Sequence, residues 1–141
     1  MPDKVFLDTN ILVYAFDADD TARQRLAADL LERHLRDRTV VLSLQILQEF
    51  FVVVTRKVKT PLEPKKARQL VGEFLRHDVV EPTSVHLLKA MDLSIGQKFS
   101  FWDSLVIVTA IEAGCKHLYS EDLKHNSIIE GLLILNPFVK N

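Results

Sequence analysis

Four carboxylates stand where the fold of this chain can bring them together: Asp8, Glu49, Asp103 and Asp122. Asp8 directly follows the apolar run 5–7, and Asp122 comes shortly after the apolar run 117–119. Carboxylates that crowd together repel one another, so four at one place make sense mainly around a cation. Oxygen ligands without a Cys or His cluster suit Mg²⁺ or Mn²⁺ better than Zn²⁺. A bound ion of this kind makes its water a better nucleophile, which is the chemistry of metal-assisted hydrolysis.

Each of these acids also has a purely structural explanation. Asp8 and Asp122 are good residues for capping a helix. Glu49 lies in an apolar helical stretch, where a buried carboxylate needs a donor, a cation or a metal, or else it faces solvent. Asp103 stands three residues after Ser100, as in a capping box, although that box prefers Glu or Gln. No single position decides between the two explanations, and only the four together favour a site.

Short β-branched or apolar runs bounded by polar residues predict strands at 5–7, 39–42, 79–80, 117–119 and 132–135. Helical patterns separate these strands along most of the chain. Strands alternating with helices predict an α/β fold, in which a parallel sheet is covered on both faces. In such sheets the site lies outside the carboxyl ends of the strands, near the point where strand order reverses.

The predicted helices cover 11–16, a segment capped by Thr21, 43–57 opened by Ser43, a segment starting near Pro64, a segment around 85–95, and 101–113. Pro64 suits a first helical turn. Val85, Leu88, Met91 and Ile95 predict an amphipathic helix whose apolar stripe faces the core. The last helix is apolar nearly all round, which predicts burial on most sides, and Gly114 should end it.

Composition is ordinary for a globular protein: 141 residues, 48% hydrophobic, 26% charged and a net charge of -1. We expect one domain, residues 1–141. The near-neutral charge neither supports nor excludes a nucleic-acid substrate. The single cysteine, Cys115, is expected in the core. The N-terminus lacks a signal-peptide pattern and no apolar run is long enough for a membrane, so we expect a cytoplasmic protein.

The densest basic stretch comprises Arg56, Lys57, Lys59, Lys65, Lys66 and Arg68. Such a stretch is a candidate for contact with an RNA backbone. The alternative is a solvated helix end whose cations complement the helix dipole.

The ordered set of motifs resembles the PIN-domain nucleases, and specifically the VapC-like toxins of toxin–antitoxin pairs. The resemblance rests on segments 6–12 (FLDTNIL), 48–50 (QEF), 101–104 (FWDS), 118–123 (LYSEDL) and 131–138. Each segment is weakly specific by itself. Together they span nearly the whole chain in the family's order.

This resemblance implies a five-stranded parallel sheet in a three-layer α/β/α sandwich, and an RNase that acts on single strands. It implies Mg²⁺ or Mn²⁺, one or two ions, at the four acids, with Thr9, Asn10 and Ser120 beside them orienting ligands or water. It also implies an antitoxin that blocks the site, and a homodimer. One departure stands at His125-Asn126, where the family has His followed by Gly, so the geometry of that loop is open.

Three other interpretations remain. A phosphatase of the haloacid dehalogenase type also begins with an Asp after its first strand, but it needs a second Asp where this chain has Asn10. A receiver domain needs an acidic pair near the first strand and no equivalent of Glu49. A catalytically silent scaffold of the same fold is the third, and retention of all four acids argues against it.

Overall fold

The computed structural model describes residues 2–139, and within them one sheet carries six strands in the order β3-β2-β1-β4-β6-β5. Their bounds are β1 Val5–Leu7, β2 Val40–Ser43, β3 Asp78–Val80, β4 His117–Tyr119, β5 Ile128–Ile129 and β6 Leu132–Leu135. Strand β1 is central, pairs in parallel with β2 and β4, and is buried at all three residues. A continuous apolar run is typical of a parallel strand that is covered on both faces.

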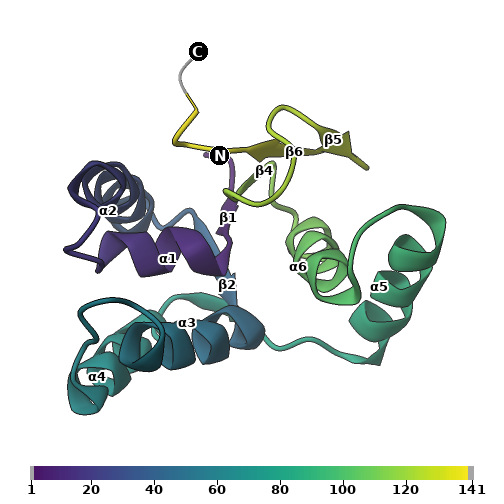
Figure 1. The fold of residues 1–141 in the computed structure, drawn as a ribbon. Coiled ribbons are helices and arrows are strands. Elements are labelled where there is room, and N and C mark those ends of the chain that lie inside the picture. Colours follow the sequence, from purple (N-terminus) through teal and green to yellow (C-terminus); the bar gives the residue numbers. More distant parts are fainter. Residues whose placement is uncertain (1, 140–141) are drawn as a thin grey trace.

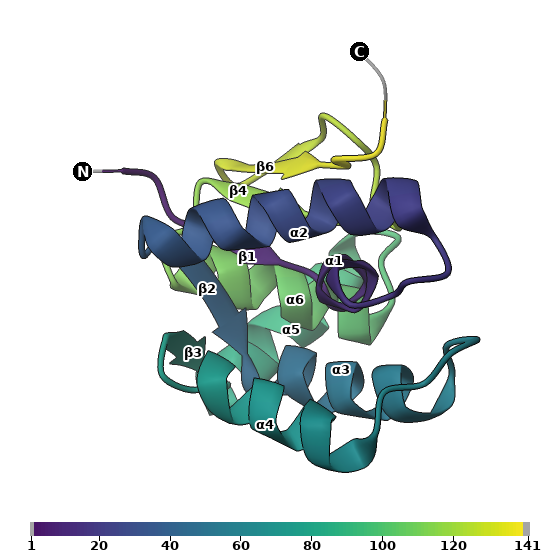
Figure 2. The same ribbon diagram turned by 90° about the vertical axis from the view of Figure 1, so that its left-hand side faces the viewer.

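Helices form a layer on each face of the sheet (Figure 1). Their bounds are α1 Thr9–Ala15, α2 Thr21–Arg36, α3 Leu44–Arg56, α4 Pro64–Phe74, α5 Ser84–Gly96 and α6 Phe101–Glu112. Helices α1 to α4 lie on one face and α5 and α6 on the other, as the turned view in Figure 2 also shows. The predicted three-layer α/β/α sandwich is therefore confirmed. Among residues 2–139, no helix is long and apolar enough to cross a membrane.

The five predicted strands are all present and mutually parallel, and β5 is an addition. It pairs antiparallel with β6, Ile128 opposite Leu133. The connecting residues Glu130 and Gly131 both have positive φ, 47° and 85°, as the tight turns of two-residue hairpins require. A strand of two residues is too short to give a periodic signal, so the sequence pattern did not reveal it.

Most predicted helix ends agree with the structure. Helix α3 starts after Ser43, whose hydroxyl accepts a hydrogen bond from Ile46 N, and Pro64 occupies the first turn of α4. The cap of α2 was predicted wrongly, because Asp20 and not Thr21 accepts the bond from Arg23 N. An aspartate immediately before the helix satisfies this exposed N–H as well as a threonine does.

The apolar stripe predicted for α5 does not face the core. Val85, Leu88, Met91 and Ile95 are 52%, 61%, 42% and 84% exposed. The helix packs on α6 instead through Ala90, which is fully buried. Helix α5 carries apolar residues on more than one side, so periodicity by itself does not tell which side meets a neighbour.

The departure at His125-Asn126 has a simple backbone explanation. Asn126 has φ +64°, and its N–H donates to the carbonyl of Ile134 at 2.8 Å. Asparagine is among the few non-glycine residues that adopt this left-handed conformation readily. The backbone is thus left-handed at the position where the resemblance leads us to expect glycine.

The prediction for Cys115 is confirmed. Its side chain is 6% exposed, and burial raises the pKa of the thiol to about 12. A thiol that stays protonated is a poor nucleophile, so Cys115 acts as a small core residue.

Candidate active site

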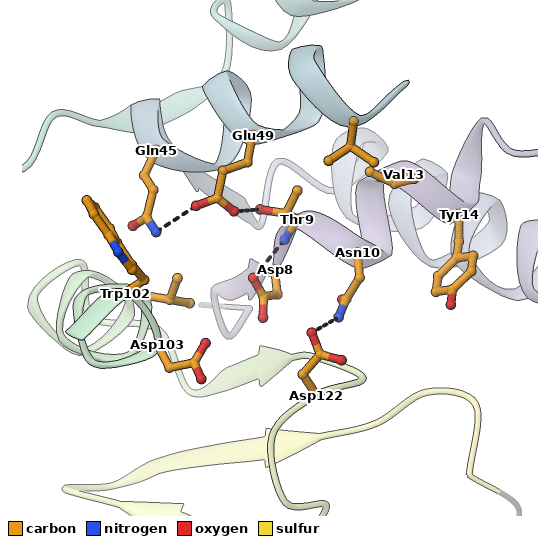
Figure 3. A pocket seen from close by; sticks show the side chains of 12 residues that line it. Asp8, Thr9, Asn10, Val13, Tyr14, Gln45, Glu49, Trp102, Asp103 and Asp122 are labelled. Carbon is orange, nitrogen blue, oxygen red and sulfur yellow. Dashed lines mark hydrogen bonds between the residues drawn. The ribbon is translucent and has the colours of Figure 1, made fainter. Parts of the chain in front are cut away.

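The four candidate carboxylates line one pocket of about 340 Å³ at the carboxyl edge of the sheet (Figure 3). Asp8 follows β1, and Asp122 follows the neighbouring strand β4. Glu49 comes from the middle of α3 and Asp103 from the first turn of α6, on the opposite face of the sheet. From β1 the chain passes through α1 and α2 to β2 on one side of it, whereas β4, which α6 precedes, lies on the other side. Strand order therefore reverses at β1, and this is where open α/β sheets form their binding crevices.

Asp8 caps a helix and also lines the pocket, so its two interpretations are not exclusive. Its Oδ1 accepts from Thr9 N at 2.8 Å at the start of α1, and its Oδ2 accepts from the Ser120 hydroxyl at 2.8 Å. Burial raises the pKa of Asp8 from 3.8 to about 6. These two hydrogen bonds oppose the increase, and the charges of Asp103 and Glu49 add to it.

Glu49 has the donors that its apolar surroundings demand. The Thr9 hydroxyl donates to Oε2 at 2.7 Å, and the Gln45 carboxamide donates to Oε1 at 2.9 Å. Gln45 stands one helical turn earlier on α3, and Thr9 stands beside Asp8. The carboxylate is therefore held toward the pocket by one contact within its helix and one from the first residue of α1.

Asp103 and Asp122 are held less tightly. Ser100 caps α6, accepting a bond from Asp103 N at 3.1 Å, so this cap uses the backbone of Asp103. No hydrogen bond to the Asp103 carboxylate is found within residues 2–139. Asp122 accepts from Asn10 Nδ2 at 3.1 Å, and its N–H donates to Ser120 Oγ at 3.3 Å. All three supporting residues, Thr9, Asn10 and Ser120, thus contact the acids.

The donor set of the pocket suits a hard cation. Among residues 2–139, its lining includes four carboxylates and no Lys, Arg or His. Within the described chain, no three Asp, Glu, His or Cys side chains lie close enough to form a ready-made metal cluster. Mg²⁺ does not require such a cage, because it usually keeps several waters and binds one or two carboxylates together with substrate phosphate.

Sequence reasoning missed three side chains that line the same pocket: Tyr14, Gln45 and Trp102. The Tyr14 hydroxyl donates to Glu121 at 2.7 Å, and Arg23 Nε donates to the same carboxylate at 2.7 Å. These pairs join residues about a hundred positions apart, so no local pattern reveals them. Trp102 was visible in the sequence only as a neighbour of Asp103.

The six basic residues lie outside the pocket. All are exposed, at the end of α3, in the loop after it and in the first turns of α4. Lys57 lines a shallow hollow that also includes Glu49, whereas Arg68 lines an apolar hollow between α3 and α4. Contact of this stretch with RNA stays a prediction.

Comparison with known families identifies the fold. The model of the PIN domain matches residues 5–129. The chain belongs to the PIN-domain family. Among curated proteins, no sequence matches it.

Solved structures with the same PIN fold include three from bacterial toxin–antitoxin systems. A toxin–antitoxin complex from Klebsiella pneumoniae superposes with a TM-score of 0.69 at 18% identity, covering 96% of this chain and 98% of that one. VapC20 of Mycobacterium tuberculosis, a toxin that cleaves the sarcin-ricin loop, superposes with a TM-score of 0.64 at 18% identity, covering 84% of this chain and 90% of that one. VapBC2 from Rickettsia felis, bound to promoter DNA, superposes with a TM-score of 0.64 at 19% identity, covering 92% of this chain and 96% of that one.

Proposed function

We propose that this PIN domain is a Mg²⁺- or Mn²⁺-dependent endoribonuclease and the toxin of a toxin–antitoxin pair. The observation that carries the proposal is the pocket itself, where four carboxylates gather and the described part of the chain contributes no basic side chain. A phosphodiester is an anion, and this pocket would repel it unless cations neutralise the carboxylates. The pocket therefore fits chemistry on phosphate only when divalent metal is bound.

Asp8, Glu49, Asp103 and Asp122 would hold the metal. When bound, a divalent cation polarises the attacking water and offsets charge on the phosphoryl oxygens. Ser120 and Thr9 N hold the carboxylate of Asp8, and the Thr9 hydroxyl and Gln45 hold that of Glu49. Hydrogen bonds of this kind orient ligating carboxylates and tune their basicity.

The biological part of the proposal draws on the family and on the printed descriptions of the similar structures. Two of these contain both toxin and antitoxin, and one toxin acts on an RNA loop. For this chain we propose an RNA substrate, an antitoxin protein that covers the pocket, a homodimer and a cytoplasmic location. A short gene directly upstream that encodes a DNA-binding antitoxin would support the pairing. Copurification with that protein, and the mass of the purified toxin in solution, test the two partners.

Cleavage of RNA by the purified protein tests the chemistry. We expect single-stranded or loop-containing RNA to be cut in Mg²⁺ or Mn²⁺, to leave 5′-phosphate and 3′-hydroxyl ends, and to stay intact in EDTA. Asp8→Asn is the matched control for a contaminating nuclease, since it keeps the size of the side chain and removes its charge. Equal cleavage in chelator would contradict the mechanism, and an intact RNA in every metal would favour the silent scaffold.

Induced expression tests the toxin role separately. We expect expression without the antitoxin to arrest bacterial growth, and Asp8→Ala to relieve the arrest while the protein still accumulates. If Asp8→Ala is as toxic as the parent, then Asp8 is only a helix cap and the proposed site is wrong.

A further inference from the structure

Trp102 is the only tryptophan of the chain and is mostly exposed. It is the second residue of α6, its side chain is 63% exposed, and it lines the pocket that contains the four carboxylates. The residues that follow on α6, from 104 to 110, are all buried. Figure 3 shows the indole at the edge of the pocket, on the side of Gln45. Exposure at this level means that Trp102 contributes little to the core.

An aromatic contact with Phe101 orients the indole. The ring of Phe101 packs against it edge to face, with centroids 5.1 Å apart and an interplanar angle of 78°. Phe101 in turn packs against the small cluster of Ala90, Leu105 and Val108 between α5 and α6. A perpendicular contact covers at most one face of the indole, so a flat, open aromatic surface remains at the edge of the pocket, on the side of Gln45.

We infer that Trp102 stacks an unpaired nucleobase of the RNA next to the phosphodiester that is cleaved. This inference rests on the proposed function and adds a binding subsite for the base. Stacking of bases on exposed aromatic side chains is the usual way in which proteins bind single-stranded RNA. A base inside a duplex has both faces covered, so only an unpaired or splayed base reaches this surface. Stacking is also a contact that the surrounding carboxylates do not oppose.

Steady-state cleavage of a single-stranded RNA by two variants tests the subsite. Trp102→Leu removes the aromatic face and keeps an apolar side chain. We expect kcat/KM to fall about 5- to 150-fold, mainly through a higher KM, because this range corresponds to the loss of one stacked base. Trp102→Phe should retain most of the activity. The melting temperature should change little in either variant, because the indole is exposed. The matched control is Ile95→Ala, an exposed apolar residue on α5 outside the pocket, which should behave like the parent.

Fluorescence of the parent protein gives a second readout, because all tryptophan emission comes from Trp102. Rapid mixing with RNA in Mg²⁺ should quench the emission before cleavage, and an abasic RNA of equal length and charge should not. The stacking inference is overturned if the parent cleaves RNA, Trp102→Leu keeps the parent's KM, and the tryptophan emission does not change with RNA. In that case the exposed indole would serve contact with another protein. If the emission is quenched but the parent does not cleave, the nuclease proposal fails and base stacking stands.

Discussion

The hydroxyl of Ser120 donates a hydrogen bond of 2.8 Å to Asp8 Oδ2, although 112 positions separate the two residues. Ser120 Oγ also accepts a hydrogen bond from Asp122 N at 3.3 Å. Strands β1 and β4 are parallel neighbours with Leu7 opposite Tyr119, so their next residues meet at one edge of the sheet. Ser120 thereby connects two of the four candidate ligands.

Ser120→Ala should weaken metal binding while leaving the fold intact. The substitution removes a hydrogen bond that orients Asp8, and loss of such a contact typically costs about 10- to 100-fold in metal affinity or activity. The dependence of RNA cleavage on Mn²⁺ concentration measures the effect. Ser94→Ala, on α5 and away from the pocket, is the control and should match the parent. An unchanged Mn²⁺ dependence in Ser120→Ala would show that this hydroxyl only supports the strand ends.

Asp8→Asn should stabilise the metal-free protein at neutral pH. Burial raises the pKa of Asp8 from 3.8 to about 6, so ionisation of this group destabilises the folded state as pH rises through that range. Ionisation of Asp8 lowers the free energy of unfolding of the parent by about 3 kcal/mol above pH 7. Below pH 3.8 the carboxyl is protonated and this loss is absent. The higher stability of Asp8→Asn relative to the parent should therefore appear only above about pH 5.

Urea unfolding in EDTA at pH 4 and pH 7.5 measures this advantage. Asp29→Asn, on an exposed part of α2, controls for the loss of one negative charge. A variant that is less stable than the parent at pH 7.5 would mean that the contacts of Asp8 outweigh the cost of burying its charge.

Asp103→Asn should abolish RNA cleavage without destabilising the metal-free fold. The cap of α6 uses the backbone N–H of Asp103, which asparagine keeps, and the change removes one of the charges that repel Asp8. Excess Mn²⁺ should raise the melting temperature of the variant less than that of the parent, because ligand stabilisation follows affinity.

Ser100→Ala is the complementary variant for this comparison. It removes the cap hydroxyl and should cost about 1 kcal/mol of stability, but the shift in melting temperature with Mn²⁺ should remain. An active Asp103→Asn with an undiminished Mn²⁺ shift would show that Asp103 is structural.

Lys57→Gln should lower kcat/KM for RNA and make cleavage less sensitive to salt. Lys57 shares a hollow with Glu49, so it is positioned to meet the RNA backbone as it leaves the pocket. One lost phosphate contact reduces the salt slope of binding by about one. Lys66→Gln, in the first turns of α4 and outside that hollow, is the matched control. Equal effects from both lysines would indicate a diffuse electrostatic contribution.

Asn126→Gly should leave stability unchanged or improve it, whereas Asn126→Ala should destabilise the fold by about 1 kcal/mol. The reason is the φ of +64°, which glycine adopts freely and alanine does not. Thermal unfolding in EDTA measures both variants. RNA cleavage should be unchanged in Asn126→Gly, since Asn126 does not line the pocket. An alanine variant as stable as the parent would argue against a left-handed backbone here.

The sequence by itself determined the layers of the fold and the edge of the sheet at which the four candidate acids gather. Apolar runs such as 5–7 and 40–42 identified the parallel strands, because a strand covered on both faces must be apolar throughout. Asp8 directly follows one strand and Asp122 comes shortly after another, and parallel pairing of these strands places both acids at one edge of the sheet. Glu49 and Asp103 were recognisable as charges within largely apolar stretches of helix.

Only the tertiary structure decided which partners these acids have and which helix faces stay exposed. The contacts of Thr9 with Glu49 and of Ser120 with Asp8 join residues 40 and 112 positions apart, and no local spacing encodes them. Helix α5 turns Ala90 and not its apolar stripe toward α6, because packing selects among several apolar faces that periodicity treats alike. The open face of Trp102 at the edge of the pocket follows from the same packing, since Phe101 contacts the ring from one side.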